Sequence, residues 1–203
     1  MTKPPIRPTA VDVVQHETLF KSYSRLDRYL LRYEQYAGGM GPVVSREVLE
    51  RGHAVAVLLF DPDRDCVVMI EQFRPGAYAA GMEPWLYEIV AGIIEDGETP
   101  EEVARRESVE EAGLEPQGLF RVQSWLATPG ISSESIELWC GRVDSRQAGG
   151  IHGVEAEGED IRVIAVPLPE VRENLRTGRY TNAATLVALQ WLLLNEDDIR
   201  KKL

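Results

Sequence analysis

The sequence is poor in the residues that most zinc and redox sites use. Its 203 residues include only two cysteines and three histidines. Cys66 and Cys140 are far apart in apolar segments and form neither a C-x-x-C pair nor a zinc-site spacing. We therefore expect two reduced thiols in the core, rather than a disulfide or a catalytic nucleophile.

Long hydrophobic runs are also missing. The longest clean run, from Ala54 to Phe60, is far shorter than the roughly 20 residues that cross a bilayer as a helix. Segment 1–10 contains proline and basic residues but lacks the apolar core of a secretory signal. These features predict a cytoplasmic protein with no membrane partner.

The sequence contains fewer basic residues than acidic residues. There are 22 Lys and Arg against 33 Asp and Glu, which gives a formal net charge of −11. This charge argues against nonspecific binding to nucleic acid, which depends on neutralising phosphates with Lys and Arg. A phosphate-bearing partner must therefore meet a local arginine cluster or a bridging cation.

Hydrophobic periodicity predicts a mixed sheet with helices packed against it, an α/β class of fold. The first half is mostly strand-like, one well-delimited helix lies in the middle, and a Gly-rich acidic loop precedes the last strand. The expected strands are 11–20, 26–36, 41–50, 53–60, 66–73, 85–91, 119–126, 135–143 and 160–168; the expected helices are 99–112, 169–176 and 182–195; the loop is 148–160.

The helix over 99–112 has unusually complete end signals. Thr99 and Glu102 have the spacing of a capping box, Pro100 suits the first helical position, and Gly113 suits the left-handed residue after the helix. The small residues Ala104, Ser108 and Ala112 share one face, which predicts close packing of that face on a sheet.

The charges of this helix are placed unfavourably. Glu107, Glu110 and Glu111 share one face and repel one another, and the last two lie where the helix dipole favours cations. A divalent cation would resolve both conflicts, because carboxylate oxygens are the ligands that Mg²⁺ prefers. The alternative is a solvated acidic face in which Arg106 pairs with Glu102 at the favourable i, i+4 spacing.

These residues match a known motif. Gly92, Glu98, Arg106, Glu107, Glu110, Glu111 and Gly113, followed by Leu114, stand at every charged and glycine position of the Nudix box. Ser108 departs from the pattern, which has an apolar residue there. Since its hydroxyl can bond back into the preceding turn, we expect a slight effect on stability and none on chemistry.

The resemblance extends over nearly the whole chain, from HAVAVLLFDPDRDCVVMIEQFR before the box to NAATLVALQWL after it. The chain resembles the ADP-ribose pyrophosphatase branch of the Nudix hydrolases, and Pro129, sixteen residues beyond Gly113, has a placement similar to the proline that marks this branch. The resemblance implies an α/β/α sandwich over 51–203 and an N-terminal β segment over 1–50 that is exchanged in a homodimer. It also implies Mg²⁺-dependent hydrolysis of ADP-ribose to AMP and ribose 5-phosphate, with several Mg²⁺ ions that Mn²⁺ can replace.

Roles for the acidic residues follow from the same resemblance. Glu157 aligns with the catalytic base, and Arg106 and Glu98 with residues that orient the box carboxylates. The implied metal ligands are the carbonyl of Ala91 with Glu107, Glu110, Glu111 and Glu159. Glu110 could instead serve only as the partner of Arg106, and loop 155–160 could be merely solvated. His152 we interpret as a loop-packing residue, because a carboxylate suffices as base beside metal-bound water.

The substrate clamp is expected to be built from a few arginines, whose planar donors suit phosphate. The positions that match substrate contacts of the family are Tyr23, Ser24, Arg46, Glu47, Arg51, Arg74, Ile93, Thr128, Pro129, Gly130 and Glu134. Tyr23 is expected to stack on adenine, with a place in the core or on a strand surface as its alternative. Ile131 stands where the family often has a second glycine.

Other functions remain to be weighed. A hydrolase of another nucleoside diphosphate sugar would bind the diphosphate in the same way and differ only in its base and sugar pockets. A noncatalytic ADP-ribose sensor has no need of Glu107, Glu111, Glu157 and Glu159 together. Isopentenyl diphosphate isomerases share the fold but use a cysteine near the site, and neither cysteine here lies in a suitable segment.

Overall fold

The structure is a computed structural model that describes residues 7–203; residues 1–6, and with them part of segment 1–10, lie outside the described residues. The chain forms two compact units. The first runs to Gly52 and includes Leu126–Glu134, and the second comprises His53–Trp125 and Ser135–Leu203. The expected division at residue 50 had assigned the segment 126–134 to the second unit.

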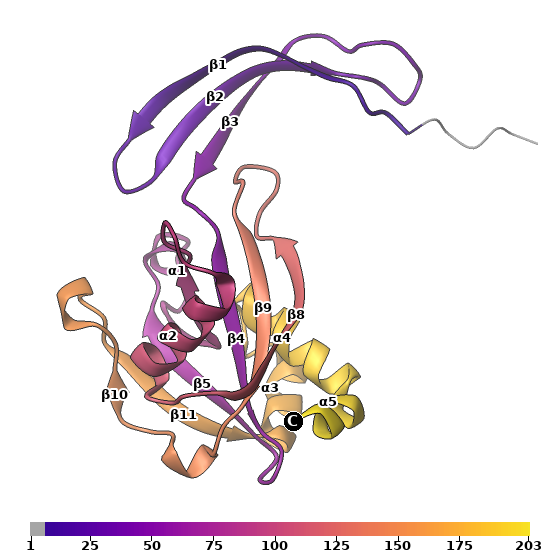
Figure 1. The fold of residues 1–203 in the computed structure, drawn as a ribbon. Helices are drawn as coiled ribbons and strands as arrows, with labels where there is room; N and C mark the ends of the chain where they lie inside the picture. The colour runs from indigo at the N-terminus through magenta and orange to yellow at the C-terminus, as the bar shows by residue number, and fades with distance from the viewer. Residues whose placement is uncertain (1–6) are drawn as a thin grey trace, which may run out of the picture. The chain divides into compact units, whose positions relative to one another are not determined.

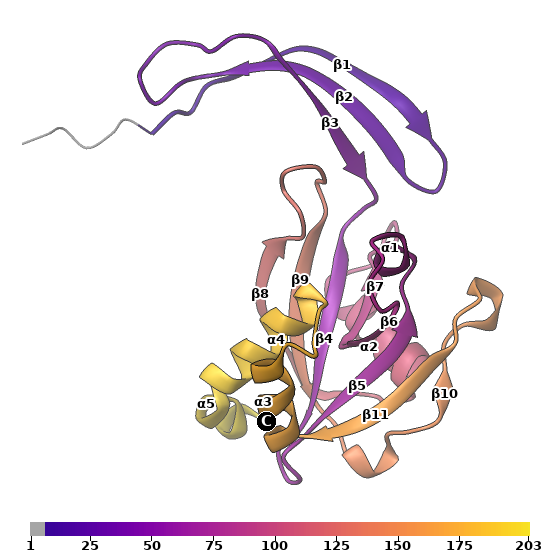
Figure 2. The same cartoon turned by 180° about the vertical axis from the view of Figure 1, so that it is seen from behind.

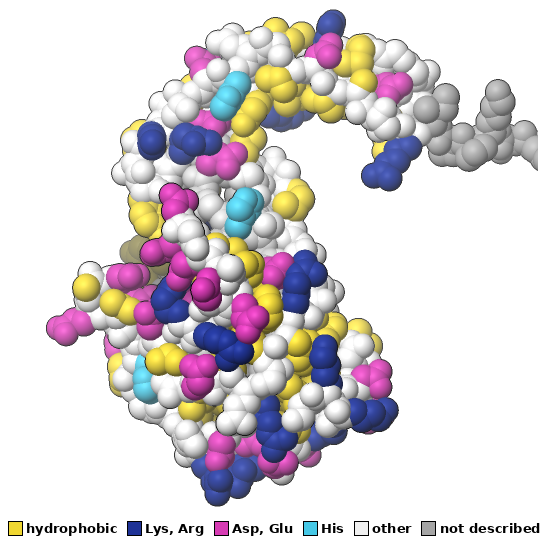
Figure 3. Space-filling model, viewed as in Figure 1, with side chains coloured by type: hydrophobic (Ala, Val, Ile, Leu, Met, Phe, Trp, Pro, Cys, Tyr) yellow, Lys and Arg dark blue, Asp and Glu magenta, His cyan; other side chains and the backbone are white. Residues whose placement is uncertain are grey.

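The first unit is built on a three-stranded antiparallel sheet, in the order β1 (Val11–Lys21), β2 (Arg25–Tyr33) and β3 (Val44–Glu50). None of its described hydrophobic side chains is buried, and Figure 3 shows such side chains at the surface of this sheet. Val11 and Phe20, for instance, are 61% and 63% exposed. This sheet therefore has no hydrophobic core of its own.

The second unit contains an eight-stranded sheet around the long buried strand β4 (Ala54–Asp61). The other strands are β5 (Cys66–Phe73), β6 (Trp85–Glu88), β7 (Val90–Ile93), β8 (Gln117–Leu126), β9 (Ser135–Arg142), β10 (Ile151–His152) and β11 (Ile161–Pro167). Their order is β10-β11-β5-β4-β9-β8, with β6 paired to β5 and β7 to β4. Strands β4 and β9 run parallel, whereas β4 pairs with β5 and β7 antiparallel.

Helices cover both faces of this sheet (Figures 1 and 2). Helix α2 (Pro100–Ala112) packs on one face, over Val55, Val57 and Leu59 of β4. Helices α3 (Leu168–Thr177), α4 (Ala183–Leu194) and α5 (Glu196–Lys202) pack on the other face, over the alternate residues of β4. The expected α/β/α sandwich is confirmed.

The sequence predicted the long elements well and missed the short ones. Eight of the nine expected strands and all three expected helices are present within a few residues of their expected bounds. The expected strand 85–91 is wrong, because this segment is divided into β6, which pairs with β5, and β7, which pairs with β4. Helix α1 (Pro75–Ala79), helix α5 and the two-residue strand β10 were not expected. The acidic loop also contains a 3₁₀ turn over Glu155–Glu157.

Two further expectations concern thiols and membranes. Both cysteines are free, and burial raises the pKa of the Cys140 thiol to about 12. Across residues 7–203, none of the helices is long and apolar enough to span a membrane.

Candidate active site

Helix α2 begins and ends as its sequence predicts. The Thr99 hydroxyl accepts a hydrogen bond from the Glu102 backbone N–H, and the Glu102 carboxylate accepts one from the Thr99 backbone N–H at 2.8 Å. Gly113 takes the left-handed conformation, with φ of 67°, that ends the helix. These caps fix the position of the acidic residues along the helix.

The small face of α2 fixes its rotation. Ala104, Ser108 and Ala112 are buried in the core cluster between helix and sheet. The Ser108 hydroxyl donates to the Ala104 carbonyl at 2.6 Å, as expected for a serine at this apolar position. Because this face is against the sheet, the carboxylates are directed to one side.

Strand β7 approaches α2 so closely that only glycine fits at position 92. A Cβ atom there would lie 1.7 Å from Oε1 of Glu107. The glycine of the motif therefore makes room for the Glu107 carboxylate beside the backbone of β7.

Arg106 holds three carboxylates of the motif together. Its guanidinium donates to Glu98 at 2.8 and 3.0 Å, to Glu107 at 2.7 Å and to Glu110 at 3.0 Å. The expected pair of Arg106 with Glu102 is wrong, because the Glu102 carboxylate is used by the capping box. The role of Arg106 as a residue that orients carboxylates is thus supported by its contacts.

Glu111 is the most deeply placed of the box carboxylates, at 2% exposure. Its Oε2 accepts a hydrogen bond from the backbone N–H of Ala91 at 2.9 Å. Burial, with the charges of Glu107 and Glu159, raises the pKa of Glu111 to about 8. Burial and the charges of Glu110 and Glu159 also raise the pKa of Glu107, against the effect of Arg106.

The acidic loop brings Glu159 to the same cluster. Its charge acts on both Glu107 and Glu111, and its Oε2 accepts from the backbone N–H of Val154 at 2.9 Å. Glu157 is exposed at the end of the 3₁₀ turn. His152 Nε2 lies 2.8 Å from the Gly149 carbonyl and its ring lies against Gly113, which supports the loop-packing interpretation.

The donor set fits a divalent cation, although its oxygens do not converge on one point. Within residues 7–203, no group of three or more His, Cys, Asp or Glu side chains lies close enough to enclose a metal ion. The carboxylates instead accept bonds from Arg106 and the β7 backbone. Burial is the main cause of the raised pKa values of Glu107 and Glu111, and the neighbouring carboxylates add to it; a hard cation would offset both effects. The assignment of individual metal ligands stays a prediction.

Two of the predicted substrate residues lie in the second unit with this cluster. The Arg74 guanidinium, at the end of β5, is close enough to Glu111 and Glu159 for their negative charges to raise its pKa. Ile93, at the end of β7, presents its carbonyl to Arg106 at 3.4 Å. The arginine thus places an anion-binding group beside the carboxylates.

Two polar residues in this region were missed by the sequence analysis. Glu88 on β6 is 2% exposed and Gln72 on β5 is 7% exposed. The Gln72 amide nitrogen lies 3.3 Å from Oε2 of Glu88 and 3.5 Å from Oε1 of Glu111. The only available signal was the occurrence of polar residues inside mainly apolar strands.

The remaining predicted substrate residues belong to the first unit. They are Tyr23 and Ser24 in the β1–β2 turn, Arg46, Glu47 and Arg51 on or after β3, and Thr128, Pro129, Gly130 and Glu134 in the segment that joins this unit. The structure brings Arg51 within 3.5 Å of Glu134. Tyr23 is 85% exposed, which rules out the core alternative.

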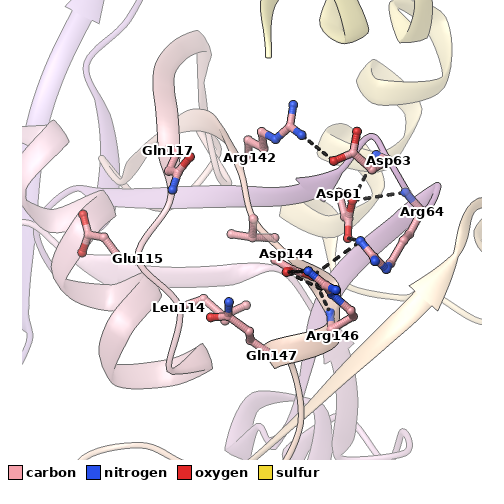
Figure 4. Close-up of a pocket in the computed structure, with 11 residues that line it drawn as sticks. Asp61, Asp63, Arg64, Leu114, Glu115, Gln117, Arg142, Asp144, Arg146 and Gln147 are labelled. Atoms are coloured by element: carbon pink, nitrogen blue, oxygen red, sulfur yellow. Dashed lines mark hydrogen bonds and ion pairs between the residues drawn. The ribbon is translucent and has the colours of Figure 1, made fainter.

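A pocket of about 220 Å³ lies elsewhere in the second unit and contains none of the predicted site residues (Figure 4). Most of its charged groups are paired with one another: Arg142 with Asp63, and Arg64 and Arg146 with Asp144. Asp61, behind them, accepts from the backbone N–H and hydroxyl of Ser145 at 2.8 and 2.6 Å. This network joins the β4–β5 turn to the segment after β9.

Known proteins resemble the chain over most of its length. It is 45% identical to the ADP-ribose pyrophosphatase of Escherichia coli K12, over 95% of this chain and 92% of that protein. The ADP-ribose pyrophosphatase of Haemophilus influenzae is 40% identical, over 91% and 87%. The GDP-mannose pyrophosphatase of Cronobacter sakazakii is 34% identical, over 73% and 78%.

A solved structure described as an ADP compounds hydrolase has the same fold, with a TM-score of 0.71 over the full length of both chains at 20% identity. The NUDIX domain model matches residues 50–189, which include strands β4 to β11 and the capped helix with its carboxylates. Together with the relatives above, this match shows that the chain belongs to the Nudix hydrolase family.

Proposed function

We propose that the protein hydrolyses the diphosphate of ADP-ribose to AMP and ribose 5-phosphate. The observation that carries this proposal is the 45% identity, over 95% of the chain, to a protein named ADP-ribose pyrophosphatase. The carboxylate cluster of α2 beside Arg74 supports it, because diphosphate hydrolysis needs charge neutralisation next to an anion clamp.

Nudix hydrolases generally need divalent metal ions, and Mg²⁺ is the proposed ion here, with Mn²⁺ as a substitute. Glu107, Glu111 and Glu159 are the carboxylates proposed to hold it, with the Ala91 carbonyl and Glu110 as further ligands. When bound, the ions neutralise phosphate charge and lower the pKa of a water molecule. Burial and the neighbouring carboxylates raise the pKa of Glu111, and a bound cation would offset both by stabilising its ionised form.

The protein's own side chains are proposed to accept the proton and to bind the substrate. Glu157, exposed on the loop, takes the proton of the attacking water. The Nη1 of Arg74 has no bonding partner among the described residues and is proposed to bind a phosphate oxygen. The residues of the first unit, with Tyr23 on adenine, are proposed to hold the rest of the substrate.

A homodimer that exchanges the N-terminal segment is part of the proposal. Its support is the lack of any buried hydrophobic side chain among the described residues of the three-stranded sheet. Such a sheet needs a covering surface to be stable. Analytical ultracentrifugation should show a dimer, and a monomer at all working concentrations would contradict it. The cytoplasm is the proposed location, on the support of two unpaired cysteines.

The decisive experiment is a substrate panel. The purified protein is incubated with Mg²⁺ and ADP-ribose, GDP-mannose, other nucleoside diphosphate sugars and dinucleotides, and the products are identified by mass. ADP-ribose should be cleaved fastest, to AMP and ribose 5-phosphate. GDP-mannose is the second candidate substrate, because of the 34% identical relative. If it is cleaved faster, the substrate assignment changes to GDP-mannose, whereas the assignment of diphosphate hydrolysis stays. Binding of ADP-ribose without turnover would indicate a sensor.

A further inference from the structure

Glu88 is a buried carboxylate whose hydrogen-bonding capacity is largely used. Its Oε2 accepts from Arg74 Nε at 2.9 Å and from the Gln72 amide at 3.3 Å, and it forms an ion pair with Arg74 Nη2 at 2.7 Å. Its Oε1 accepts from the Asn182 amide at 2.7 Å. A carboxylate so occupied is poorly suited to act as a base or a metal ligand, so its role must be sought in the groups that it holds.

Three carboxylates attract the Arg74 guanidinium. Burial alone would lower the pKa of its guanidinium, but the charges of Glu88, Glu111 and Glu159 raise it above its ordinary value, so all three act on it. Among the described residues, however, the guanidinium hydrogen-bonds only to Glu88. Glu88 thus holds a cationic group that would otherwise be attracted to the other two carboxylates.

We propose that Glu88 is a positioning residue that keeps Arg74 away from Glu111 and Glu159, which leaves their oxygens to a divalent cation. The inference rests on the proposed function, which assigns these two residues as metal ligands. Gln72 supports the same arrangement, because its amide nitrogen lies between Glu88 and Glu111, at 3.3 and 3.5 Å from their oxygens.

The consequence of removing the Glu88 charge follows from electrostatics. Glutamine keeps the shape of the side chain but cannot neutralise the guanidinium, so in Glu88→Gln the arginine moves toward Glu111 or Glu159. A guanidinium bound there competes with the cation for the same oxygens. Removing Arg74 as well removes the competitor, so the second substitution should rescue the first. A purely structural role for Glu88 predicts no such rescue.

The test uses Mg²⁺ alone as the probe. The thermal unfolding midpoint is followed against Mg²⁺ concentration, without substrate, for wild type, Glu88→Gln, Arg74→Ala and the double variant. Glu88→Gln should need about 10-fold more Mg²⁺ for half of the stabilisation, the lower end of the effect of outer partners of metal sites. The double variant should return close to the value of Arg74→Ala.

Glu71→Gln is the matched control. It also removes a half-buried carboxylate of β5 that pairs with an arginine, Arg162, but it has no hydrogen bond to Arg74, Gln72 or Glu111 in the structure. Its Mg²⁺ midpoint should equal that of wild type. If Glu88→Gln does not fold, Glu88→Asp replaces it, because the shorter side chain cannot hold the guanidinium at the same place, and rescue by Arg74→Ala is tested in that background.

Each outcome separates this inference from the proposed function. An unchanged Mg²⁺ midpoint in Glu88→Gln, or a shift that Arg74→Ala does not rescue, overturns the positioning role even if wild type hydrolyses ADP-ribose. A rescued shift in a protein that leaves ADP-ribose intact supports the positioning role and overturns the substrate assignment. If Mg²⁺ does not stabilise wild type, the inference and the metal site both fail.

Discussion

Single residues of the acidic loop divide into fixed and exposed groups. His152 is held by the Gly149 carbonyl and lies against Gly113, whereas Glu157 is exposed and its carboxylate forms no hydrogen bond or ion pair with the described residues. A proton acceptor on a loop has to reach the attacking water when substrate binds. The exposed carboxylate meets this need better than the packed imidazole does.

Glu157→Gln should therefore lower kcat by about 10²–10⁴-fold, the usual contribution of a general base, with little change in KM. His152→Ala serves as the comparison and should keep most of the turnover. Both are measured by steady-state kinetics with ADP-ribose at saturating Mg²⁺. Near-full turnover in Glu157→Gln, with activity abolished in His152→Ala, would make the histidine the base.

Asp61 allows a test of pH dependence outside the active site. Burial opposes its ionisation, but hydrogen bonds from Ser145 and from the turn backbone leave its pKa below the ordinary 3.8. A lowered pKa in the folded state means that ionised Asp61 stabilises the protein above about pH 4, and that this stability is lost as the pH falls through the folded-state pKa.

Asp61→Asn should lower the free energy of unfolding by about 1–3 kcal/mol at pH 7, because buried donors lose a charged acceptor. The difference from wild type should shrink as the pH falls below about 4. Urea unfolding at pH 7, 5 and 3 measures it. Asp63→Asn is the control, since Asp63 is exposed and its pair with Arg142 should contribute little. A difference that does not vary with pH would contradict the interpretation.

The box residues could be found from the sequence because a fixed spacing on one helix determines their common face. Glu88 and Gln72 could not, because isolated polar residues in apolar strands give no sign of whether they are buried, and the burial of Glu88 depends on a partner as distant as Asn182. The wrong pairing of Glu102 with Arg106 has a local reason. The Glu102 carboxylate could pair either with Arg106 or with Thr99 in the capping box, and in the structure it accepts hydrogen bonds from Thr99.

At the scale of elements, the contact between β7 and α2 controls the site. Since a Cβ at position 92 would overlap Glu107, Gly92→Ala should displace that carboxylate and lower Mg²⁺ affinity and activity by about 10–100-fold. Gly76→Ala in α1 is the matched control, because a Cβ there meets nothing within 4 Å. Mg²⁺ titration and kcat measure the effect, and a fully active Gly92→Ala variant would contradict it.

Element prediction succeeded where the signals are local. Helix α2 carries its own capping box and terminal glycine, so both ends could be read from neighbouring residues. Helix α1 has no side-chain cap and no buried residue, and α5 buries only Ile199. Such short helices are determined by their tertiary surroundings, so the hydrophobic pattern gives no sign of them.

At the scale of the whole molecule, the proposed metal site should make stability depend on the cation. Mg²⁺ at 100 times its dissociation constant should raise the free energy of unfolding by about 2.7 kcal/mol, because it binds the folded state alone. Glu111→Gln should fold but show a smaller rise. Thermal unfolding with EDTA and with millimolar Mg²⁺ tests this. Equal shifts in wild type and variant would mean that Glu111 is not a ligand.

The parallel pairing of β4 with β9 has a consequence for the order of folding. It joins residues 54–60 to residues 136–142, and β5, β6, β7 and α2 all lie in the chain between them. Closing so long a loop costs conformational entropy, and this cost is offset only when the central strands pair. A nascent chain that ends before Ser135 therefore carries the complete motif from Gly92 to Gly113 without the strand that completes the centre of its sheet. We expect such a chain to lack any response to Mg²⁺, which should appear during refolding only together with the signals of the finished core.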